Sequence, residues 1–292
     1  MTADFFFGCL FSCLLLPELL GQELKIIKTY TLPNELHEIS GIITLDQGFS
    51  FYAINDGGNP AIIYHLDSIG QIIRRIKIPN ASNIDWEDMT TDFKEYVYIS
   101  DTGDNKRKRP EKKVYKIKIN ELQNKNEVFA ETLNLNFLTI KSEKSSKNLN
   151  KTHDIEAVYW QNNELVFFSK NWNPKKMPIS WIYRADQNQS KQTLYPFLSN
   201  KYSHRFYLES QISGACKDPN SDKIYLITGT ELFECETSHL ENKWTKYTFD
   251  FISQKEALCL LRENHLVITQ EANKKLLQMP QMHFIQIIPP SK

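Results

Sequence analysis

A short pattern recurs five times along the chain and places one oxygen-bearing side chain at its third position. An acid or amide opens each copy, and a small residue or Asp follows the third position. The third-position residues are Ser40, Glu87, Glu156, Ser213 and Glu256. Oxygen ligands without His or Cys are typical of sites for hard cations, and Ca²⁺ takes roughly 6–8 of them. We therefore predict that these residues form a calcium site.

The carboxylates among these residues are a further reason to expect a cation. Three Glu side chains that met at one point would repel and would raise one another's pKa, and a bound cation removes that cost. Mg²⁺ fits less well because it demands strict octahedral geometry and keeps more of its water. Two alternatives stay open: the residues only mark the turn where each unit begins, or the ion is purely structural.

The sequence around the pattern indicates the fold that would bring these side chains together. The second positions of the copies lie 43 to 69 residues apart, at Ile39, Trp86, Ile155, Ile212 and Lys255. Short β-type runs separated by turn residues follow each copy, in sets of four. The predicted fold is all-β, a five-bladed β-propeller of four-stranded antiparallel blades, with six blades as the alternative.

In such a propeller the innermost strand of each blade lines a central channel, so the third positions would converge near the axis. Residues Leu24–Leu32 form an extra strand that we expect to pair with the last blade and close the ring. Within that last blade, Lys275–Met279 and His283–Ile288 are predicted as the third and fourth strands.

Polar loops follow the second strand of several units and would gather at one mouth of the channel. The candidates for binding a small or oligomeric anionic ligand there are Asp56, Asp101, Asn105, Arg109, Lys170 and Asn171. An Arg side chain can grip an anion as a fork, and Lys170 adds a point charge beside Trp172. The alternative is ordinary turn chemistry, because Asp and Asn are common in turns for backbone reasons.

Three acids near the mouth are candidates for acid–base catalysis: Asp85, Asp88 and Asp104. Beside a bound cation, one of them could activate water for hydrolysis of a phosphate or an ester. His153 precedes the third copy, but a lone His is more often a surface residue. The sequence contains no P-loop, GxSxG, HExxH or EF-hand motif.

The N-terminus predicts an exported protein. An apolar run from Phe5 to Leu16 is too short to cross a membrane and suits a signal peptide, although Asp4 rather than a basic residue precedes it. We expect a signal peptide over residues 1–22 and a single propeller domain over residues 23–292. The mature protein would then be periplasmic or extracellular, without a transmembrane segment.

Overall charge excludes an electrostatic attraction to nucleic acid or to a membrane surface, because 35 basic and 35 acidic residues give a formal net charge of +0. We expect a monomer. Outside the leader the cysteines are Cys216, Cys235 and Cys259, without a CxxC motif. Buried core thiols are the favoured interpretation, with a Cys216–Cys259 disulfide as the alternative.

The order Ser, Glu, Glu, Ser, Glu resembles the soluble calcium-activated nucleotidases (apyrases), which are five-bladed propellers with calcium on the axis. That resemblance implies that Ser40, Glu87, Glu156, Ser213 and Glu256 hold the ion. The stretches Asn83–Asp88 and Asp101–Asn105 are similar to sequences in exported bacterial propellers described as SdiA-regulated or phytase-esterase-like, and the chain is closer overall to that group.

This chain departs from the nucleotidases after the second strand of its first unit. The nucleotidases carry an acidic-Arg turn there, whereas Asn55–Asn59 contains no Arg, and their large nucleotide-binding insertions are missing. We therefore expect a calcium-binding propeller with a polar mouth, and metal-assisted hydrolysis of a phosphate or ester if it is an enzyme. The alternative is a non-catalytic binding or scaffold propeller with a structural ion.

Overall fold

In the computed structural model, residues 23–106, 108–138, 154–170, 179–201, 211–240, 244–250, 253–273, 275 and 277–288 are described. The predicted leader, residues 1–22, lies outside them, as do His153, Asn171 and Trp172. Predictions that rest on those residues alone stay predictions.

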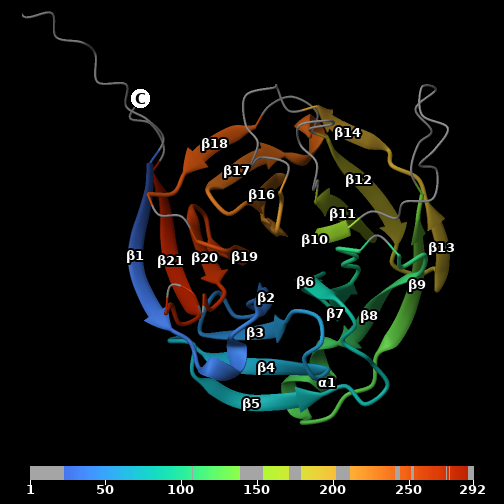
Figure 1. The fold of residues 1–292 in the computed structure, drawn as a ribbon, viewed down its shortest axis with the longest axis horizontal. Helices are drawn as coiled ribbons and strands as arrows, with labels where there is room; N and C mark the ends of the chain where they lie inside the picture. Colours follow the sequence, from blue (N-terminus) through green and yellow to red (C-terminus); the bar gives the residue numbers. More distant parts are fainter. Residues whose placement is uncertain are drawn as a thin grey trace, which may run out of the picture.

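Five sheets surround a central channel and form a closed ring (Figure 1). Each sheet is one blade, and its strands run outward from the channel in chain order, except that the outermost strand of blade 5 comes from the N-terminus. Blade 1 contains β2 (Ile39–Ile43), β3 (Ser50–Asn55), β4 (Ile62–Asp67) and β5 (Ile72–Lys77). Blade 2 contains β6 (Trp86–Thr91), β7 (Tyr96–Asp101), β8 (Lys112–Lys118) and β9 (Glu131–Phe137). The five-bladed all-β prediction is confirmed.

The remaining blades follow the same plan. Blade 3 contains β10 (Asp154–Gln161), β11 (Glu164–Lys170), β12 (Ile179–Asp186) and β14 (Leu198–Lys201). Blade 4 contains β15 (Gly214–Lys217), β16 (Lys223–Ile227), β17 (Glu231–Glu236) and β18 (Thr245–Thr248). Blade 5 contains β19 (Lys255–Arg262), β20 (His265–Gln270), β21 (Gln281–Ile288) and β1 (Glu23–Thr31). Described helices are short: α1 (Ile119–Asn124), η1 (Asn34–Leu36) and η2 (Thr237–His239).

The N-terminal strand closes the ring. β1 pairs antiparallel with β21 over Glu23–Thr31, so the first described strand completes the last blade (Figure 1). This confirms the predicted closure, which leaves blade 5 with no missing outer strand.

One detail of the predicted strand order is wrong. Lys275–Met279 is not the third strand of blade 5, because β21 takes that place and β1 supplies the fourth strand. The chain after β12 gives two strands: β14 pairs with β12 as the fourth strand of blade 3, and β13 (Lys191–Leu194) pairs parallel with β9 of blade 2. Strand propensity cannot distinguish these partners, because pairing depends on the loops that bring strands together.

Apolar side chains hold adjacent blades together. Each of the five core clusters joins two neighbouring blades, as where Ile54 of β3 packs with Met89 of β6 and Val97 of β7. Flat faces of successive sheets therefore share their buried surface around the ring. Since the inner part of each blade is buried on both faces, inner strands such as β3 and β7 are nearly continuous runs of buried residues.

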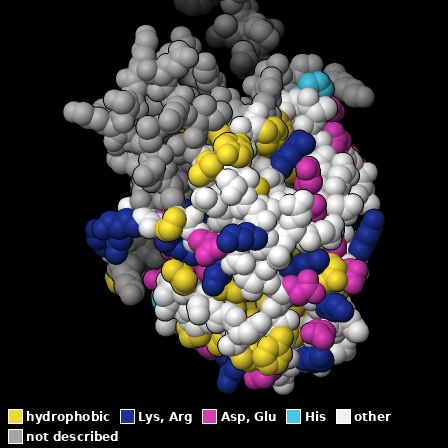
Figure 2. Space-filling view, turned by 90° about the vertical axis from the view of Figure 1, so that its right-hand side faces the viewer, with side chains coloured by type: hydrophobic (Ala, Val, Ile, Leu, Met, Phe, Trp, Pro, Cys, Tyr) yellow, Lys and Arg dark blue, Asp and Glu magenta, His cyan; other side chains and the backbone are white. Residues whose placement is uncertain are grey.

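The outer surface carries charges of both signs. Figure 2 shows one side of the molecule, on which Lys and Arg side chains are interspersed with Asp and Glu. This face offers no surface of a single charge sign, in agreement with the neutral sequence. None of the described helices has the length and apolarity that crossing a membrane requires.

Asp88 bonds three blades together near the channel. Its side chain is buried, and its carboxylate accepts the backbone N–H groups of Met89 (2.8 Å), Val158 (2.9 Å) and Ala215 (3.2 Å). These donors lie on or beside the inner strands β6, β10 and β15, in blades 2, 3 and 4. The position favours a structural role for Asp88 over the predicted role in proton transfer, which stays a prediction.

Removing the Asp88 carboxylate should destabilise the ring. Asp88→Ala leaves three buried N–H groups without an acceptor, and we expect the free energy of unfolding to fall by about 3 kcal/mol or more. Asp67→Ala is the matched control, because Asp67 also accepts two backbone N–H groups but on the exposed β4–β5 hairpin. Urea denaturation measures both; equal losses would contradict this role.

Candidate metal and ligand site at the channel mouth

A β-bulge turns the third-position side chain toward the channel in four blades. The pairing between first and second strands skips Ser40, Glu87, Glu156 and Glu256, each of which has no partner residue on the second strand. A bulge adds one residue to one strand and redirects its side chain. The repeated pattern in the sequence is therefore the signature of a repeated bulge at the start of the inner strand.

Hydroxyl groups bond the bulges of neighbouring blades together. Ser40 Oγ donates to the carbonyl of Trp86 at 3.0 Å, and Ser213 Oγ donates to that of Lys255 at 2.6 Å. Thr102 Oγ1 does the same for Ile155 at 2.8 Å. Both third-position serines thus join one blade to the next. A hydroxyl that donates its proton keeps its lone pairs, so these contacts are compatible with the predicted ligand role.

Buried carboxylates gather where the bulges of blades 2 and 3 meet. Carboxylate oxygens of Glu87, Asp154 and Glu156 lie within 4.8 Å of one another, and all three side chains are buried. A second group, formed by Asp56, Asp85 and the same Glu87, satisfies the same distance. The structure therefore brings together two of the five predicted calcium ligands and two acids from the predicted mouth.

Gly103 provides the space that these carboxylates occupy. A Cβ atom at this position would lie 1.8 Å from Glu87 Oε1 and 2.6 Å from Asp85 Cγ. Any larger residue would displace both acids. All the side-chain ligands offered here are oxygen atoms, and Gly103 leaves the room in which they lie close together. The residues present therefore fit a hard divalent cation.

Lys170 adds one positive charge to this acidic mouth. Its Nζ lies 2.9 Å from Glu156 Oε2. Burial acts to lower the pKa of Lys170, but the carboxylates of Glu156, Glu256 and Glu87 outweigh burial and raise it, so the ammonium stays charged. One ammonium offsets only part of the negative charge here.

Burial and crowding raise the pKa of several carboxyl groups at this mouth. Burial, followed by the charge of Glu156, raises the pKa of Glu87 well above its usual value of 4.5. Burial also raises the pKa of Glu156. For Asp85, burial and the nearby Asp56 raise the pKa to about 6. For Glu271, burial and then Glu256 raise the pKa to about 9. Without a cation, this mouth therefore favours protonated carboxyl groups.

Other predicted mouth residues bind one another. Arg109 pairs with Asp101 at 2.9 Å and donates to the carbonyl of Gly103 at 2.6 Å. Asp104 accepts the backbone N–H of Arg109 at 3.0 Å and pairs with buried Lys112 at 3.3 Å. These contacts order the loop after β7 and hold Gly103 in place. Asn105 is exposed at the tip of the same loop.

Sequence reasoning missed one acid of this site, Asp154. Asp154 belongs to the acidic group with Glu87 and Glu156. A signal for Asp154 was present, because it occupies the first position of the repeated pattern, as Asp85 does. That position also carries an oxygen-bearing side chain in every copy.

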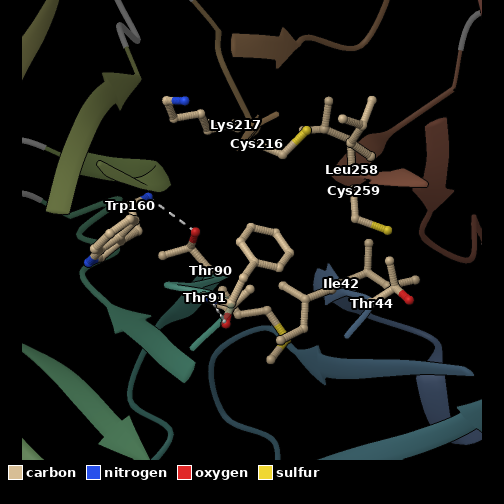
Figure 3. Close-up of a pocket in the computed structure, with 14 residues that line it drawn as sticks. Ile42, Thr44, Thr90, Thr91, Trp160, Cys216, Lys217, Leu258 and Cys259 are labelled. Atoms are coloured by element: carbon tan, nitrogen blue, oxygen red, sulfur yellow. Dashed lines mark hydrogen bonds between the residues drawn. The ribbon is translucent and has the colours of Figure 1, made fainter. Parts of the chain in front are cut away.

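The other end of the channel is different in character. About three or four residues further along the inner strands, a small hollow is lined mainly by apolar side chains, including Ile42, Leu258 and Trp160 (Figure 3). In Figure 3 the Trp160 backbone N–H donates to Thr90 Oγ1, at 3.2 Å. Acidic side chains do not line this hollow, so the carboxylates mark one mouth of the channel.

The cysteines at this apolar end are thiols. Cys216 packs against the core between blades 4 and 5, whereas Cys259 belongs to the core between blades 5 and 1. Because the two side chains pack on opposite sides of β19, the geometry favours the core-thiol interpretation over a disulfide. Cys235 is also a buried free thiol.

Comparison with known proteins supports the fold. The PQQ-bound aldose sugar dehydrogenase from Streptomyces coelicolor is similar with a TM-score of 0.50 and 10% identity, covering 91% of this chain and 98% of that one. The Cps50 (Swd1) β-propeller domain of Myceliophteria thermophila (TM-score 0.46, 8% identity, 91% and 100% covered) and a chain of a nidogen/laminin complex (0.46, 10%, 80% and 72%) also match.

At these identities the likeness shows the fold alone. No family model matches the chain, and no curated protein matches its sequence. The propeller is therefore established from its own topology, and the chemistry of the mouth has to be argued from its own residues.

Removing one crowded carboxyl should change how stability depends on pH. The folded-state pKa of Glu271 is raised from 4.5 to about 9, so the cation-free folded state loses stability through this group as pH rises across that interval. In chelator, Glu271→Gln should therefore gain stability relative to the unsubstituted chain as pH increases. Urea denaturation across the interval measures the difference.

The control for this experiment is Glu263→Gln, which changes an exposed residue at the β19–β20 hairpin. Its difference from the unsubstituted chain should not vary with pH. A Glu271→Gln difference that stays flat, or that reverses its sign, would contradict the crowding of carboxylates at the mouth.

Proposed function

We propose that this chain is a calcium-binding propeller whose acidic mouth binds a small or oligomeric anionic ligand and hydrolyses a phosphate or ester bond in it. The observation that carries the proposal is the buried group formed by Glu87, Asp154 and Glu156. Three buried carboxylates with one neighbouring ammonium are costly unless further positive charge joins them. A divalent cation supplies that charge.

The choice of Ca²⁺ follows from the donor set. Glu87 and Glu156 provide carboxylate oxygens, and Asp154 adds a third from the first position of the same pattern. Ser40, Ser213 and Glu256 complete the ligands predicted from the sequence. An all-oxygen set from several blades suits the flexible coordination of Ca²⁺ better than the strict octahedron of Mg²⁺ or the N and S ligands of Zn²⁺.

Residues around the ion site would bind and orient an anionic substrate. When bound, the cation would polarise a phosphoryl or carbonyl oxygen and lower the pKa of water. Lys170 offers an ammonium at the same mouth. Of the three predicted acid–base residues, Asp85 lies in the acidic group, whereas Asp88 bonds blades together and Asp104 orders a loop.

One observation favours the second candidate, a non-catalytic binding or scaffold propeller with a structural ion. Both third-position serines and Asp88 bond neighbouring blades at this end of the channel. An ion among Glu87, Asp154 and Glu156 would likewise join blades 2 and 3. Activity measured in the presence and absence of Ca²⁺ separates the two functions.

Export belongs to the proposal as well. The apolar run before Glu23 is the basis for it, and β1 begins at Glu23 with the pairing that closes blade 5. We propose that the mature propeller acts in the periplasm or outside the cell. There Ca²⁺ is available at concentrations that suit extracellular sites, with Kd values on the order of 10⁻⁴–10⁻³ M.

The effect of Glu87→Gln on stability should depend on whether Ca²⁺ is bound. In saturating Ca²⁺ the unsubstituted chain should gain about 2.7 kcal/mol at a concentration of 100 Kd, and Glu87→Gln should lose most of that gain. In chelator the variant should melt at the same temperature or higher, since it removes a buried acid whose charged form is unfavourable beside Glu156. Thermal unfolding with and without Ca²⁺ measures both effects.

A matched control for this substitution is Glu131→Gln, because the Glu131 side chain is 64% exposed on β9. It should respond to Ca²⁺ as the unsubstituted chain does. No response of the unsubstituted chain to Ca²⁺, or an equal response of Glu87→Gln, would count against a cation at this mouth.

Hydrolysis is tested with chromogenic phosphate and carboxylic esters. We expect the purified chain to release product in Ca²⁺ and to stop in chelator, and Glu87→Gln to lose at least about tenfold in kcat/KM because it lacks an ion ligand. If Ca²⁺ stabilises the chain but neither class of ester is hydrolysed, the scaffold alternative is the better description.

A further inference from the structure

Glu87 belongs to two acidic groups at once. Its carboxylate lies within 4.8 Å of Asp154 and Glu156 on one side and within the same distance of Asp56 and Asp85 on the other. The two groups therefore meet at one shared side chain. A carboxylate has two oxygens, so it can contact a separate positive charge on each side.

Glu87 is also a buried acceptor without a protein donor. The residue is 6% exposed, and among the described residues its carboxylate takes part in no hydrogen bond or ion pair. Buried polar groups are nearly always satisfied, and an unsatisfied carboxylate is among the most costly of them. Its Oε1 fills the space left by Gly103, between the two groups. This side chain thus points to a ligand that the protein does not itself supply.

Two glycines leave room for the second group. Asp85 lies between two glycines: a Cβ at Gly57 would lie 2.6 Å from Asp85 Oδ1, and one at Gly103 would lie 2.7 Å from Asp85 Oδ2. Asp56 is fixed beside it, because its Oδ1 accepts the backbone N–H of Gly57. Both oxygens of Asp85 therefore occupy space that a side chain at position 57 or 103 would fill.

Charge distinguishes the two groups. Lys170 lies against Glu156, on the side of the first group. In the second group, the nearby Arg109 is bonded to Asp101 and to the carbonyl of Gly103 rather than to Asp56 or Asp85. The five carboxylates of the two groups face one Lys170 ammonium, so a single divalent cation would leave an excess of negative charge that a second cation would offset.

We propose that the mouth binds two divalent cations, with Glu87 as the carboxylate that bridges them and with Asp56 and Asp85 as ligands of the second. This inference rests on the proposed function, because the first cation is the one on Glu87, Asp154 and Glu156. Asp85 is then a metal ligand rather than a general base. Paired cations stabilise the attacking and leaving oxygens of a phosphoryl transfer, so the substrate class is a phosphate ester.

Manganese provides a direct test, because Mn²⁺ is a hard divalent ion and is paramagnetic. The full chain is stripped with chelator and dialysed against Mn²⁺ alone; metal content and the electron paramagnetic resonance spectrum are then recorded. We expect about two equivalents per chain and the spectrum of a spin-coupled pair, as in two-metal sites. Asp85→Asn should keep about one equivalent and give the spectrum of an isolated ion.

Two further variants show whether a loss of metal comes from the missing ligand or from misfolding. Asp56→Asn removes the other ligand of the second cation and should reproduce the result of Asp85→Asn. Asp67→Asn, on the β4–β5 hairpin, should keep both equivalents. One equivalent in the unsubstituted chain, or two in both Asp85→Asn and Asp56→Asn, would overturn the second site and leave the first intact. No bound Mn²⁺ and no Ca²⁺ response would overturn both.

Discussion

Crowding of buried carboxylates at one end of the channel is the constraint on which the rest of this structure depends. Glu87, Asp154 and Glu156 lie together in the interior, with Asp56 and Asp85 beside them and the Lys170 ammonium against Glu156. Burial raises the pKa of Glu87, and the charge of Glu156 adds to the effect. A protein can hold such a group only if the fold fixes its members and either protons or a cation offset their charge.

The fold fixes them by repeating one device. A bulge at the start of the inner strand turns the third-position side chain toward the channel, and a hydroxyl from the preceding blade bonds the neighbouring carbonyl in three of the five blades. Asp88 joins three inner strands below this level. The carboxylates are thus attached to the most constrained part of each blade, while glycines at positions 57 and 103 leave room for them.

Much of this arrangement could be read from the sequence, because the pattern that begins each inner strand is short, repeated and followed by β-type runs. The pattern predicted five blades and the convergence of Glu87 with Glu156, and the β-type run before its first copy predicted the closing strand. The sequence could not show which strands pair, because loops decide which strands meet. β13 pairs with a strand of blade 2, and β21 takes the place in blade 5 that was predicted for Lys275–Met279. Sequence also could not show that Arg109 and Lys112 bind Asp101 and Asp104.

The most direct test of the central claim is a crystal structure of the chain grown with Ca²⁺. The proposed function predicts an ion in contact with carboxylate oxygens of Glu87, Asp154 and Glu156, at about 2.3–2.6 Å from each ligand oxygen. A structure at saturating Ca²⁺ in which those three carboxylates contact only protein groups, such as the Lys170 ammonium, and water would contradict it.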